Sequence, residues 1–402
     1  MTFLLTVPSN RSSTMRWVAE IVFGEMLGFT VEITDGPGQE CVLAAEGRSL
    51  VMPSIFPDLD RERSQWVAQL PQLPLAEWNV MESLPETDVE GLLPVLFGDP
   101  DLSLSEDEIR CGIDILGTIF FMLSRFEEIV LPDRDRHGRF PAEASLAWKG
   151  GFLYRPVVDE YVDVLWAMMK RLWPRLERTR RQGTVKVSCD VDRPFDPIGR
   201  DPVTLLRVLR HELLVKPRPG IAAKRAVNFV AHRFGDYRFD PYHTFDWYLE
   251  ACEKAGRAAT FYFIADHSAG PIDGSYRIDE PRIVDLIHKI ATHGHDIGVH
   301  GSYNTFRDVS QIRKERGRLA DACRKAGIEA ELSGNRQHYL RWDTAETPDH
   351  LDEAGFRYDT TGSYADRPGF RYGTSHPFAM WSWRHQAPLR IRQHPLVLME
   401  CS

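Results

Sequence analysis

Cysteine is scarce in this chain of 402 residues, and its placement argues against a disulfide-stapled or zinc-finger protein. No two of the six cysteines form a CxxC pair, and a chain of this length can build its own hydrophobic core. The cysteines are Cys41, Cys111, Cys189, Cys252, Cys323 and Cys401. We therefore expect reduced thiols and a cytoplasmic protein.

Long apolar runs are also missing. The longest, residues 113–123, contains Asp114 and is far shorter than the roughly 20 residues needed to span a bilayer, so we expect a buried helix and no transmembrane segment. The amino terminus lacks a basic region, and its apolar run ends within a few residues, by Pro8. This pattern predicts neither a signal peptide nor a membrane anchor.

The chain has no excess of positive charge. It contains 49 Lys and Arg residues against 58 Asp and Glu, a formal net charge of −9, and it shows no continuous polybasic face. Binding to nucleic acid is therefore not expected. A hydrophobic fraction of 43% with 27% charged residues is typical of a globular protein, and the length favours two domains. We place the boundary near residue 180, giving an α/β accessory domain at 1–180 and a second domain at 181–402.

Strands and helices alternate in the second domain. Strand-like runs at 184–190, 259–264, 296–300 and 329–332 are separated by helical patterns, including one opened by Pro281 and one at 309–326. Repeated β-α-β units predict parallel strands with helices outside, and place a functional site at the carboxyl ends of the strands. In the first domain the spacing predicts helices at 12–27, 106–129 and 156–173.

Acidic and histidine side chains gather at those predicted strand ends. Asp190 and Asp192 are separated by Val191, and alternate side chains of an extended strand share a face, so the two carboxylates should lie side by side. His300 closes the run Gly294-His295-Asp296-Ile297-Gly298-Val299-His300, and Arg336-Gln337-His338-Tyr339 follows a later strand. Together these residue types indicate a divalent-metal hydrolase site.

These motifs, in this order, resemble the polysaccharide deacetylases of the NodB-homology type, carbohydrate esterase family 4, over residues 183–402. The amino-terminal half resembles the uncharacterised domain found ahead of such deacetylases in some bacterial proteins. The resemblance implies a distorted (β/α)7-type barrel that holds a divalent metal, usually zinc, through one Asp and two His. It also implies an adjacent Asp that acts as the general base.

Carried over by position, the resemblance assigns Asp190 as the base and Asp192 and His300 as metal ligands. The family has its two acids adjacent, whereas Val191 intervenes here, so the roles of Asp190 and Asp192 are open to exchange. Asn304 stands where the second histidine ligand is expected, and an amide oxygen is a poor zinc ligand. His338 is the alternative third ligand.

The resemblance gives roles to further residues. Arg336 would orient the base, and the backbone N–H of Tyr339 would face the developing oxyanion. The residues assigned to substrate are Tyr303, Asn304, Trp342, Asp359 and Tyr364, with Asp366 as a second-tier candidate. The family's final histidine, which protonates the leaving amine, has no counterpart before Ser402. Residues 395–400 read as the start of a late barrel strand, so we expect a carboxyl-terminally truncated domain.

The segment from 194 to 242 is rich in basic residues and lies close to the first motif. Its interpretation is either a set of solvated helix faces or a lid that grips an anionic handle, such as the phosphates of a nucleotide- or lipid-linked sugar. The basic residues are Arg200, Arg207, Arg210, Lys216, Arg218, Lys224, Arg225 and Arg233.

The sequence therefore predicts a metal-dependent, most simply zinc-dependent, carbohydrate N-deacetylase. Its expected partner is an N-acetylated sugar or glycan intermediate of a bacterial surface glycan. Two alternatives stay open: an amidase of the same barrel that acts on a small non-sugar amide, and a degenerate relative that binds glycan without turnover.

Overall fold

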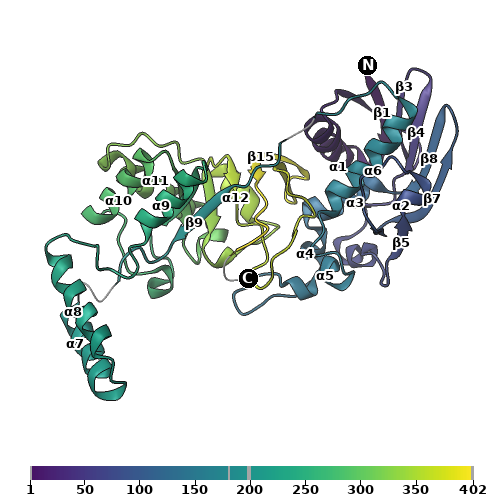
Figure 1. Ribbon diagram of the computed structural model, residues 1–402. Coiled ribbons are helices and arrows are strands. Elements are labelled where there is room, and N and C mark those ends of the chain that lie inside the picture. The colour runs from purple at the N-terminus through teal and green to yellow at the C-terminus, as the bar shows by residue number, and fades with distance from the viewer. Residues whose placement is uncertain (1, 180–181, 197–200, 400–402) are drawn as a thin grey trace. The chain divides into compact units, whose positions relative to one another are not determined.

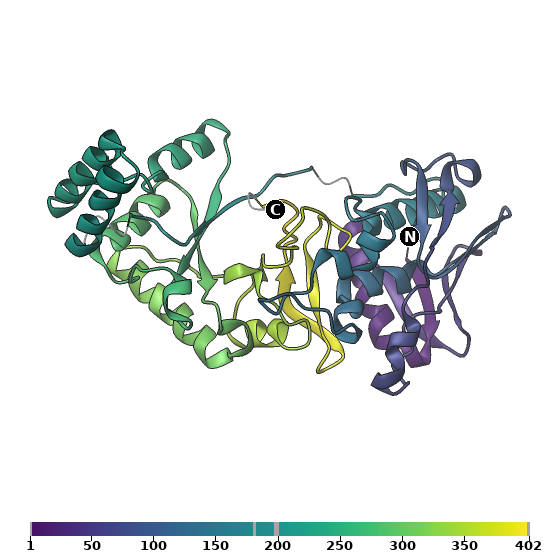
Figure 2. The same ribbon diagram turned by 90° about the horizontal axis from the view of Figure 1, so that it is seen from below.

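The structure is a computed structural model that describes residues 2–179, 182–196 and 201–399. The chain forms two compact units (Figures 1 and 2). The first combines Met1–Gly183 with Tyr339–Ser402, and the second is Thr184–His338. One break between the units thus falls beside the boundary expected near residue 180, whereas the last part of the chain groups with the first unit. Arg200 and residues 400–402 lie outside the described residues.

A six-stranded mixed sheet organises the first unit. Its order is β2-β1-β3-β4-β8-β7, with β1 parallel to β2 and β4 parallel to β8. The strands are β1 (Phe3–Pro8), β2 (Val31–Gly36), β3 (Glu40–Ala45), β4 (Arg48–Pro53), β7 (Gly98–Leu104) and β8 (Glu108–Ile113). A separate pair is β5 (Ala76–Asn79) and β6 (Leu92–Val95).

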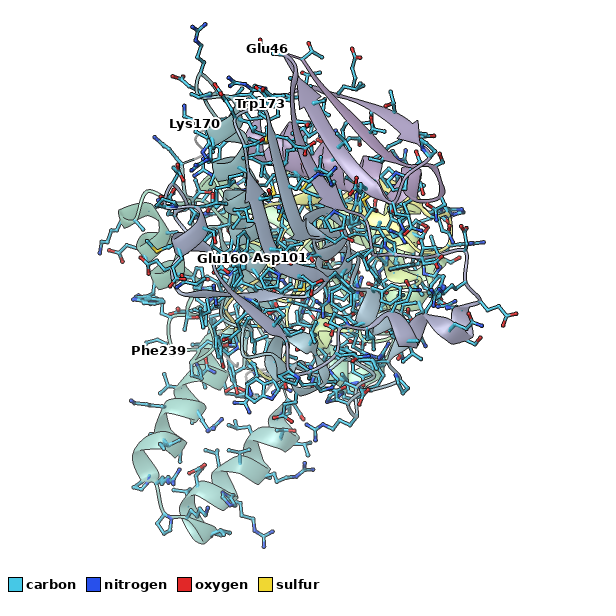
Figure 3. All side chains as sticks on the ribbon, turned by 90° about the vertical axis from the view of Figure 1, so that its right-hand side faces the viewer. Glu46, Asp101, Glu160, Lys170, Trp173 and Phe239 are labelled. Carbon is cyan, nitrogen blue, oxygen red and sulfur yellow. The ribbon has the colours of Figure 1, made fainter. Side chains whose placement is uncertain are left out.

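Helices bury their apolar sides in the core of this unit. All residues of α3 (Ile115–Ser124) are buried, as the apolar run 113–123 predicts. In α6 (Val157–Leu172) buried apolar residues recur at helical spacing, and Figure 3 labels Glu160 and Lys170 on this helix, with Trp173 just beyond its end. The other helices are α1 (Ser12–Ala19), continued by η2 (Glu20–Leu27), α2 (Val80–Ser83), α4 (Phe126–Val130) and α5 (Leu146–Lys149).

The carboxyl-terminal residues complete this core. The indole N–H of Trp17 donates to the carbonyl of Ala379 (2.9 Å), and that of Trp383 donates to the carbonyl of Ser124 (2.8 Å). The elements involved are α12 (Thr347–Glu353), β13 (Tyr358–Asp359), β14 (Phe378–Ser382) and β15 (Ala387–Gln393). Strand β15 pairs antiparallel with β14 and parallel with β13.

Three expected elements are wrong in detail. The strand predicted at 329–332 is irregular, and the regular strand there begins two residues later, at Gly334. The helix predicted at 106–129 begins as strand β8, in which Ile109, Cys111 and Ile113 alternate with less buried residues, and the buried Asp114 then caps α3 through the N–H of Gly117. The strand predicted at 395–400 is irregular over its described part, 395–399, and the regular strand is the preceding β15.

Parallel strands form the second unit. Strands β9 (Val187–Val191), β10 (Ala259–Ile264), β11 (Asp296–Gly301) and β12 (Gly334–Gln337) are parallel neighbours in chain order. The connecting helices are α7 (Pro202–Arg210), α8 (Pro219–Arg233), α9 (Phe245–Lys254), α10 (Pro281–Thr292) and α11 (Val309–Lys325). Pro281 begins α10 as predicted, and its buried Ile283, Leu286, Ile287 and Ile290 form the expected stripe.

The α/β class expected from the sequence is confirmed. Helices separate the parallel strands of the second unit, and the first unit has a mixed sheet with helices. Among the described residues the strands form open sheets and no closed barrel. Over the same residues, no helix has the length and apolar character needed to cross a membrane.

Candidate metal centre

The polar residues of the second unit meet at one edge of its parallel sheet. The strand registers pair Tyr262 with Asp190, Ile264 with His300, and His300 with Arg336. Carboxyl ends of parallel strands share an edge, so side chains that are far apart in the sequence converge there. Asp192 follows β9 directly and His338 follows β12.

Asp192, His300 and His338 form a cluster able to hold a metal ion. Their potential ligand atoms all lie within 4.8 Å of one another. Oδ1 of Asp192 is 3.4 Å from Nε2 of His300 and 3.8 Å from Nε2 of His338. Both histidines are almost fully buried, whereas the side chain of Asp192 is half exposed.

Hydrogen bonds to the far side of each ring aim both histidines at Asp192. Nδ1–H of His300 donates to the carbonyl of Arg336 (2.9 Å), and Nδ1–H of His338 donates to Oδ1 of Asp273 (2.9 Å). An oxygen acceptor at Nδ1 fixes the tautomer whose Nε2 carries the lone pair. Metal-binding histidines in proteins are oriented in this way by carbonyls and carboxylates.

Asp273, which the sequence did not single out, is the main addition to the predicted site. Its fully buried carboxylate accepts the N–H groups of Tyr303 (2.7 Å) and Ala269 (2.8 Å) as well as the His338 bond. Gly274, the next residue, has a positive φ of +85°, and a Cβ there would lie 2.6 Å from the carbonyl oxygen of Asp192. The Asp-Gly pair therefore holds this turn against the metal cluster.

Asp190 lies beside the cluster and is held by a charged partner. Nη1 of Arg336 donates to Oδ1 of Asp190 (2.9 Å), and Nη2 donates to the hydroxyl of Ser188 (2.8 Å). The guanidinium also lies over the ring of Tyr262, 4.8 Å from its centroid. Oδ2 of Asp190 is 4.0 Å from Nε2 of His300, so one carboxylate oxygen is fixed and the other is turned toward the cluster.

Electrostatics in the cluster favour a positive charge between the carboxylates. Burial alone would raise the pKa of Asp192, but the His300 and His338 side chains outweigh it and lower that pKa. Burial would likewise lower the pKa of His300, but Asp190 and Asp192 outweigh it and raise that pKa. A cation bound here would take the place of that proton.

The donor set fits a zinc-like ion. Oδ1 of Asp192 is a buried carboxylate oxygen with no hydrogen-bond donor among the described residues. Ligand atoms held about 2.0–2.1 Å from one tetrahedral ion lie about 3.4 Å apart, close to the separations found here. Two imidazoles and one carboxylate leave a fourth position for a water or a substrate oxygen, as in catalytic zinc sites.

The two predicted substrate residues of this unit lie in the loop after β11. Asn304 donates its side-chain amide to the carbonyl of Ser268 (3.1 Å), and its backbone N–H donates to the Ser268 hydroxyl (2.8 Å). Tyr303 contributes its backbone N–H to Asp273. His338 joins Asp192 and His300 in the cluster, and the side-chain N–H of Asn304 is bound to Ser268.

The remaining predicted residues belong to the first unit. The ring of Trp342 is buried beside a cavity of about 20 Å³. Asp359 is fully buried and accepts the N–H (2.6 Å) and hydroxyl (2.7 Å) of Thr361, whereas Asp366 accepts a long bond from Ala142 N–H (3.4 Å).

Tyr364 lies in a buried charged network of the first unit. Its hydroxyl accepts from Nη2 of Arg125 (2.9 Å), which also binds Glu127 (2.6 Å). Arg371 donates to both oxygens of Glu128 (2.9 and 2.7 Å), and Arg125 donates to Glu128 as well (2.8 Å). Burial raises the pKa of Glu128, but the two arginines outweigh it and hold that pKa far below its ordinary value.

Tyr339, predicted to offer its N–H to an oxyanion, is the first residue of the carboxyl-terminal part of the first unit. Its backbone is left-handed (φ 60°), which is uncommon for a residue with a side chain. Its carbonyl accepts from Nη1 of Arg139 (2.8 Å), and its ring lies 4.9 Å from that of His137.

A cavity of about 280 Å³ opens beside the two carboxylates of the second unit. Asp190 and Asp192 line one part, and Tyr242, Phe245 and Tyr248 line another. The side chain of Tyr242 is exposed. This volume is at the small end of ligand pockets, which span about 300–1,000 Å³, and suits a compact polar group.

Comparison with known protein families finds one match, outside the metal cluster. Residues 3–174 match a family model described as "Family of unknown function (DUF7033)". No match to the chain is found among the curated proteins or among the solved structures. The matched segment is less than half of the chain, and it covers most of the amino-terminal part of the first unit.

Proposed function

We propose that this protein is a divalent-metal-dependent hydrolase that removes the acetyl group from an N-acetylated amino sugar of a bacterial glycan or its precursor. The observation that carries the proposal is the meeting of Asp192, His300 and His338 beside a separate carboxylate, Asp190, that Arg336 holds in place. Zinc is the metal that this set of ligands suits best.

The residues of the cluster divide into those that bind and those that move a proton. A divalent cation bound by Asp192, His300 and His338 would polarise the amide carbonyl and acidify a water. Arg336 keeps one oxygen of Asp190 occupied, and the other oxygen faces the cluster and accepts the proton of the attacking water. The same proton is then available for the nitrogen that leaves when the C–N bond breaks.

The division of roles between the two acids follows from their partners. Asp190 bonds a guanidinium, which orients a base, whereas Oδ1 of Asp192 faces the two Nε2 atoms and has no donor among the described residues. Asp192 is thus the better ligand and Asp190 the better base. This agrees with the first of the two assignments that the spacing left open.

The sugar part of the proposal depends on the family resemblance and on the cavity. Four parallel strands that neighbour one another in chain order resemble part of a (β/α) barrel wall, which supports the deacetylase barrel. Tyr242 and Tyr248 give the 280 Å³ cavity aromatic surface of the kind that packs on sugar rings. A single sugar unit fits this size better than a long polymer.

Metal content and acetate release together test the proposal. Zinc should bind stoichiometrically to the wild type and to Asp190→Asn, and should be lost in Asp192→Ala and His300→Ala. Acetate release from N-acetylated oligosaccharides should fall about 10²–10⁴-fold in Asp190→Asn, because its general base is removed. Mass spectrometry of bound metal and an enzymatic acetate assay provide the measurements.

The matched control is His293→Ala, which removes an exposed histidine of the same unit and should change neither readout. Equal metal content in all variants would contradict the site. Metal bound as expected, without acetate release from any sugar or small amide, would instead support the alternative of a binding protein without turnover. Release from small amides only would favour the amidase.

A further inference from the structure

The second unit carries a helical hairpin that its own core does not cover. Helix α7 continues into η6 (His211–Val215), and α8 returns beside it (Figure 1). No residue of α7 or η6 is buried, and in α8 only Ala222, Asn228 and His232 are. Helices of this length ordinarily owe their stability to an apolar face packed on a core.

The surface of the hairpin is unusually apolar. Leu206 is 70% exposed, Leu214 73% and Phe234 84%. Along α8, Val227, Val230 and Phe234 recur at helical spacing and form one exposed stripe. Other exposed apolar side chains of the hairpin are Val203, Leu213, Val215 and Ile221, and Phe239, labelled in Figure 3, follows shortly after it.

The same hairpin is strongly basic. Residues 202–233 contain a single acidic residue, Glu212, in a chain whose formal net charge is −9. The basic residues are Arg207, Arg210, Lys216, Arg218, Lys224, Arg225 and Arg233. Positive charge is therefore concentrated on the same hairpin that exposes the apolar side chains.

Apolar and basic side chains share one side of the hairpin. On α7 and η6, Leu206, Arg210 and Leu214 are spaced four residues apart and are all exposed. At the turn, the exposed Leu213-Leu214-Val215 run is followed by Lys216 and Arg218, which are also exposed. Such mixing of apolar and basic groups is typical of segments that lie in the interface of an anionic membrane.

The base of the hairpin is anchored to the rest of the unit. Nε2 of His232 in α8 pairs with the buried carboxylate of Asp240 (2.6 Å), which also accepts the N–H of Asp196. Arg225 lies 3.6 Å from the carboxylate of Asp196. Among the described residues no side-chain bond of this kind holds the turn end, whose Leu213, Leu214 and Val215 are exposed.

We propose that the hairpin of α7, η6 and α8 docks the protein on the surface of a membrane that contains anionic phospholipids. The exposed Leu and Val side chains enter the boundary between headgroups and acyl chains, and the arginines and lysines bind the lipid phosphates. Charge complementarity selects this occupant. Two hairpins packed face to face would bring their basic groups together, which disfavours a second copy of the chain.

Vesicle binding tests this inference with the full chain. The protein should float with phosphatidylcholine vesicles that contain phosphatidylglycerol, bind phosphatidylcholine alone much more weakly, and dissociate as salt is raised. Leu206→Ser with Leu214→Ser should weaken binding about tenfold or more, because apolar insertion is removed. Arg207→Gln with Arg210→Gln should weaken it about tenfold and reduce its salt dependence.

Controls use exposed residues of the first unit: Val67→Ser for the apolar pair and Arg390→Gln for the charged pair, and both should bind vesicles as the wild type does. Equal binding to both vesicle types, or no effect of either hairpin variant, would overturn the inference. Concentration-dependent dimerisation without vesicle binding, abolished by the leucine changes, would assign the surface to a second copy. The assay needs neither metal nor sugar, so its outcome is independent of the proposed hydrolase activity.

Discussion

One charged cluster of each unit differs from the other in how its carboxylate is satisfied, the Glu128 cluster of the first unit and the Asp192 cluster of the second. In the first unit Arg125 and Arg371 surround Glu128, and Thr344 donates a further bond to it (2.5 Å). In the second unit Oδ1 of Asp192 faces two imidazoles and has no donor among the described residues. A buried network whose charges are all paired is a structural part of the fold, whereas a carboxylate oxygen without a donor beside two imidazoles is suited to bind a cation.

We expect the loss of one carboxylate charge to destabilise the first unit much more than the second. Glu128→Gln should lower the free energy of unfolding of the first unit by about 3–5 kcal/mol, because two buried guanidinium groups lose their counter-charge. Asp192→Asn, in chelator-treated protein, should change the stability of the second unit by about 1 kcal/mol or less, because the side chain of Asp192 is half exposed and its ion pair with His300 is screened by solvent. Hydrogen exchange followed by mass spectrometry resolves the two units. Equal destabilisation by the two changes would remove the distinction.

Asp273 is a satisfied carboxylate of the second unit, and one of its hydrogen bonds holds His338, a ligand of the cluster. Asp273→Asn should weaken zinc binding about 10–100-fold, since His338 loses the charged acceptor that orients its ring. Competition with a chromophoric chelator provides the measurement. Asp279→Asn, at an exposed aspartate of the same unit paired with Arg277, is the matched control and should bind zinc as the wild type does. Unchanged affinity in Asp273→Asn would show that the ring is held by packing alone.

The pKa shifts predict a smaller effect with a defined sign. The pKa of His300 is raised above its ordinary 6.5, so in metal-free protein its ion pair stabilises the fold below that pH and is lost as pH rises through the folded-state pKa. The lowered pKa of Asp192 stabilises the fold above its ordinary 3.8, and this contribution is lost as pH falls through the folded value. The affinity for zinc should decrease as pH falls, because the protonated His300 ring cannot bind the metal.

Zinc must displace the His300 proton, so its affinity should fall by about tenfold per pH unit once that ring is protonated. Calorimetric titrations in a series of buffers measure both the affinity and the proton release. Affinity that stays constant from neutral to mildly acidic pH would mean that His300 is not a ligand.

The strand ends explain what the sequence predicted well. Asp190, Asp192 and His300 follow or end strands with clear apolar patterns, and parallel pairing brings such ends together regardless of their sequence separation. Asp273 had no such signal, because it lies in a short turn, η7 (Gly270–Asp273), whose position depends on tertiary contacts. An Asp-Gly pair after a strand is the only local hint.

The sequence was less informative about buried charge. Tyr364 and Asp359 were assigned to substrate by resemblance, and both make hydrogen bonds inside the first unit. The residue type alone does not distinguish a polar residue of a buried structural network from one of a functional site. The distinction requires the contacts that the side chain makes. The helix predicted at 106–129 was wrong in its first part. The short strand β8 precedes Asp114, and its alternation of buried and less buried residues is weaker than the helical pattern that follows Asp114.

The first unit joins segments that are far apart in the sequence, so its core cannot be completed until the later segment has been synthesised. Trp17 and the residue that accepts its indole hydrogen bond, Ala379, are 362 positions apart, and the ring of Trp381 packs on those of Trp17 and Phe120. During synthesis the aromatic side chains of the amino-terminal part of this unit therefore stay uncovered until the residues around Ala379 have left the ribosome. The second unit is contiguous and escapes this delay, so chaperone dependence should centre on the first.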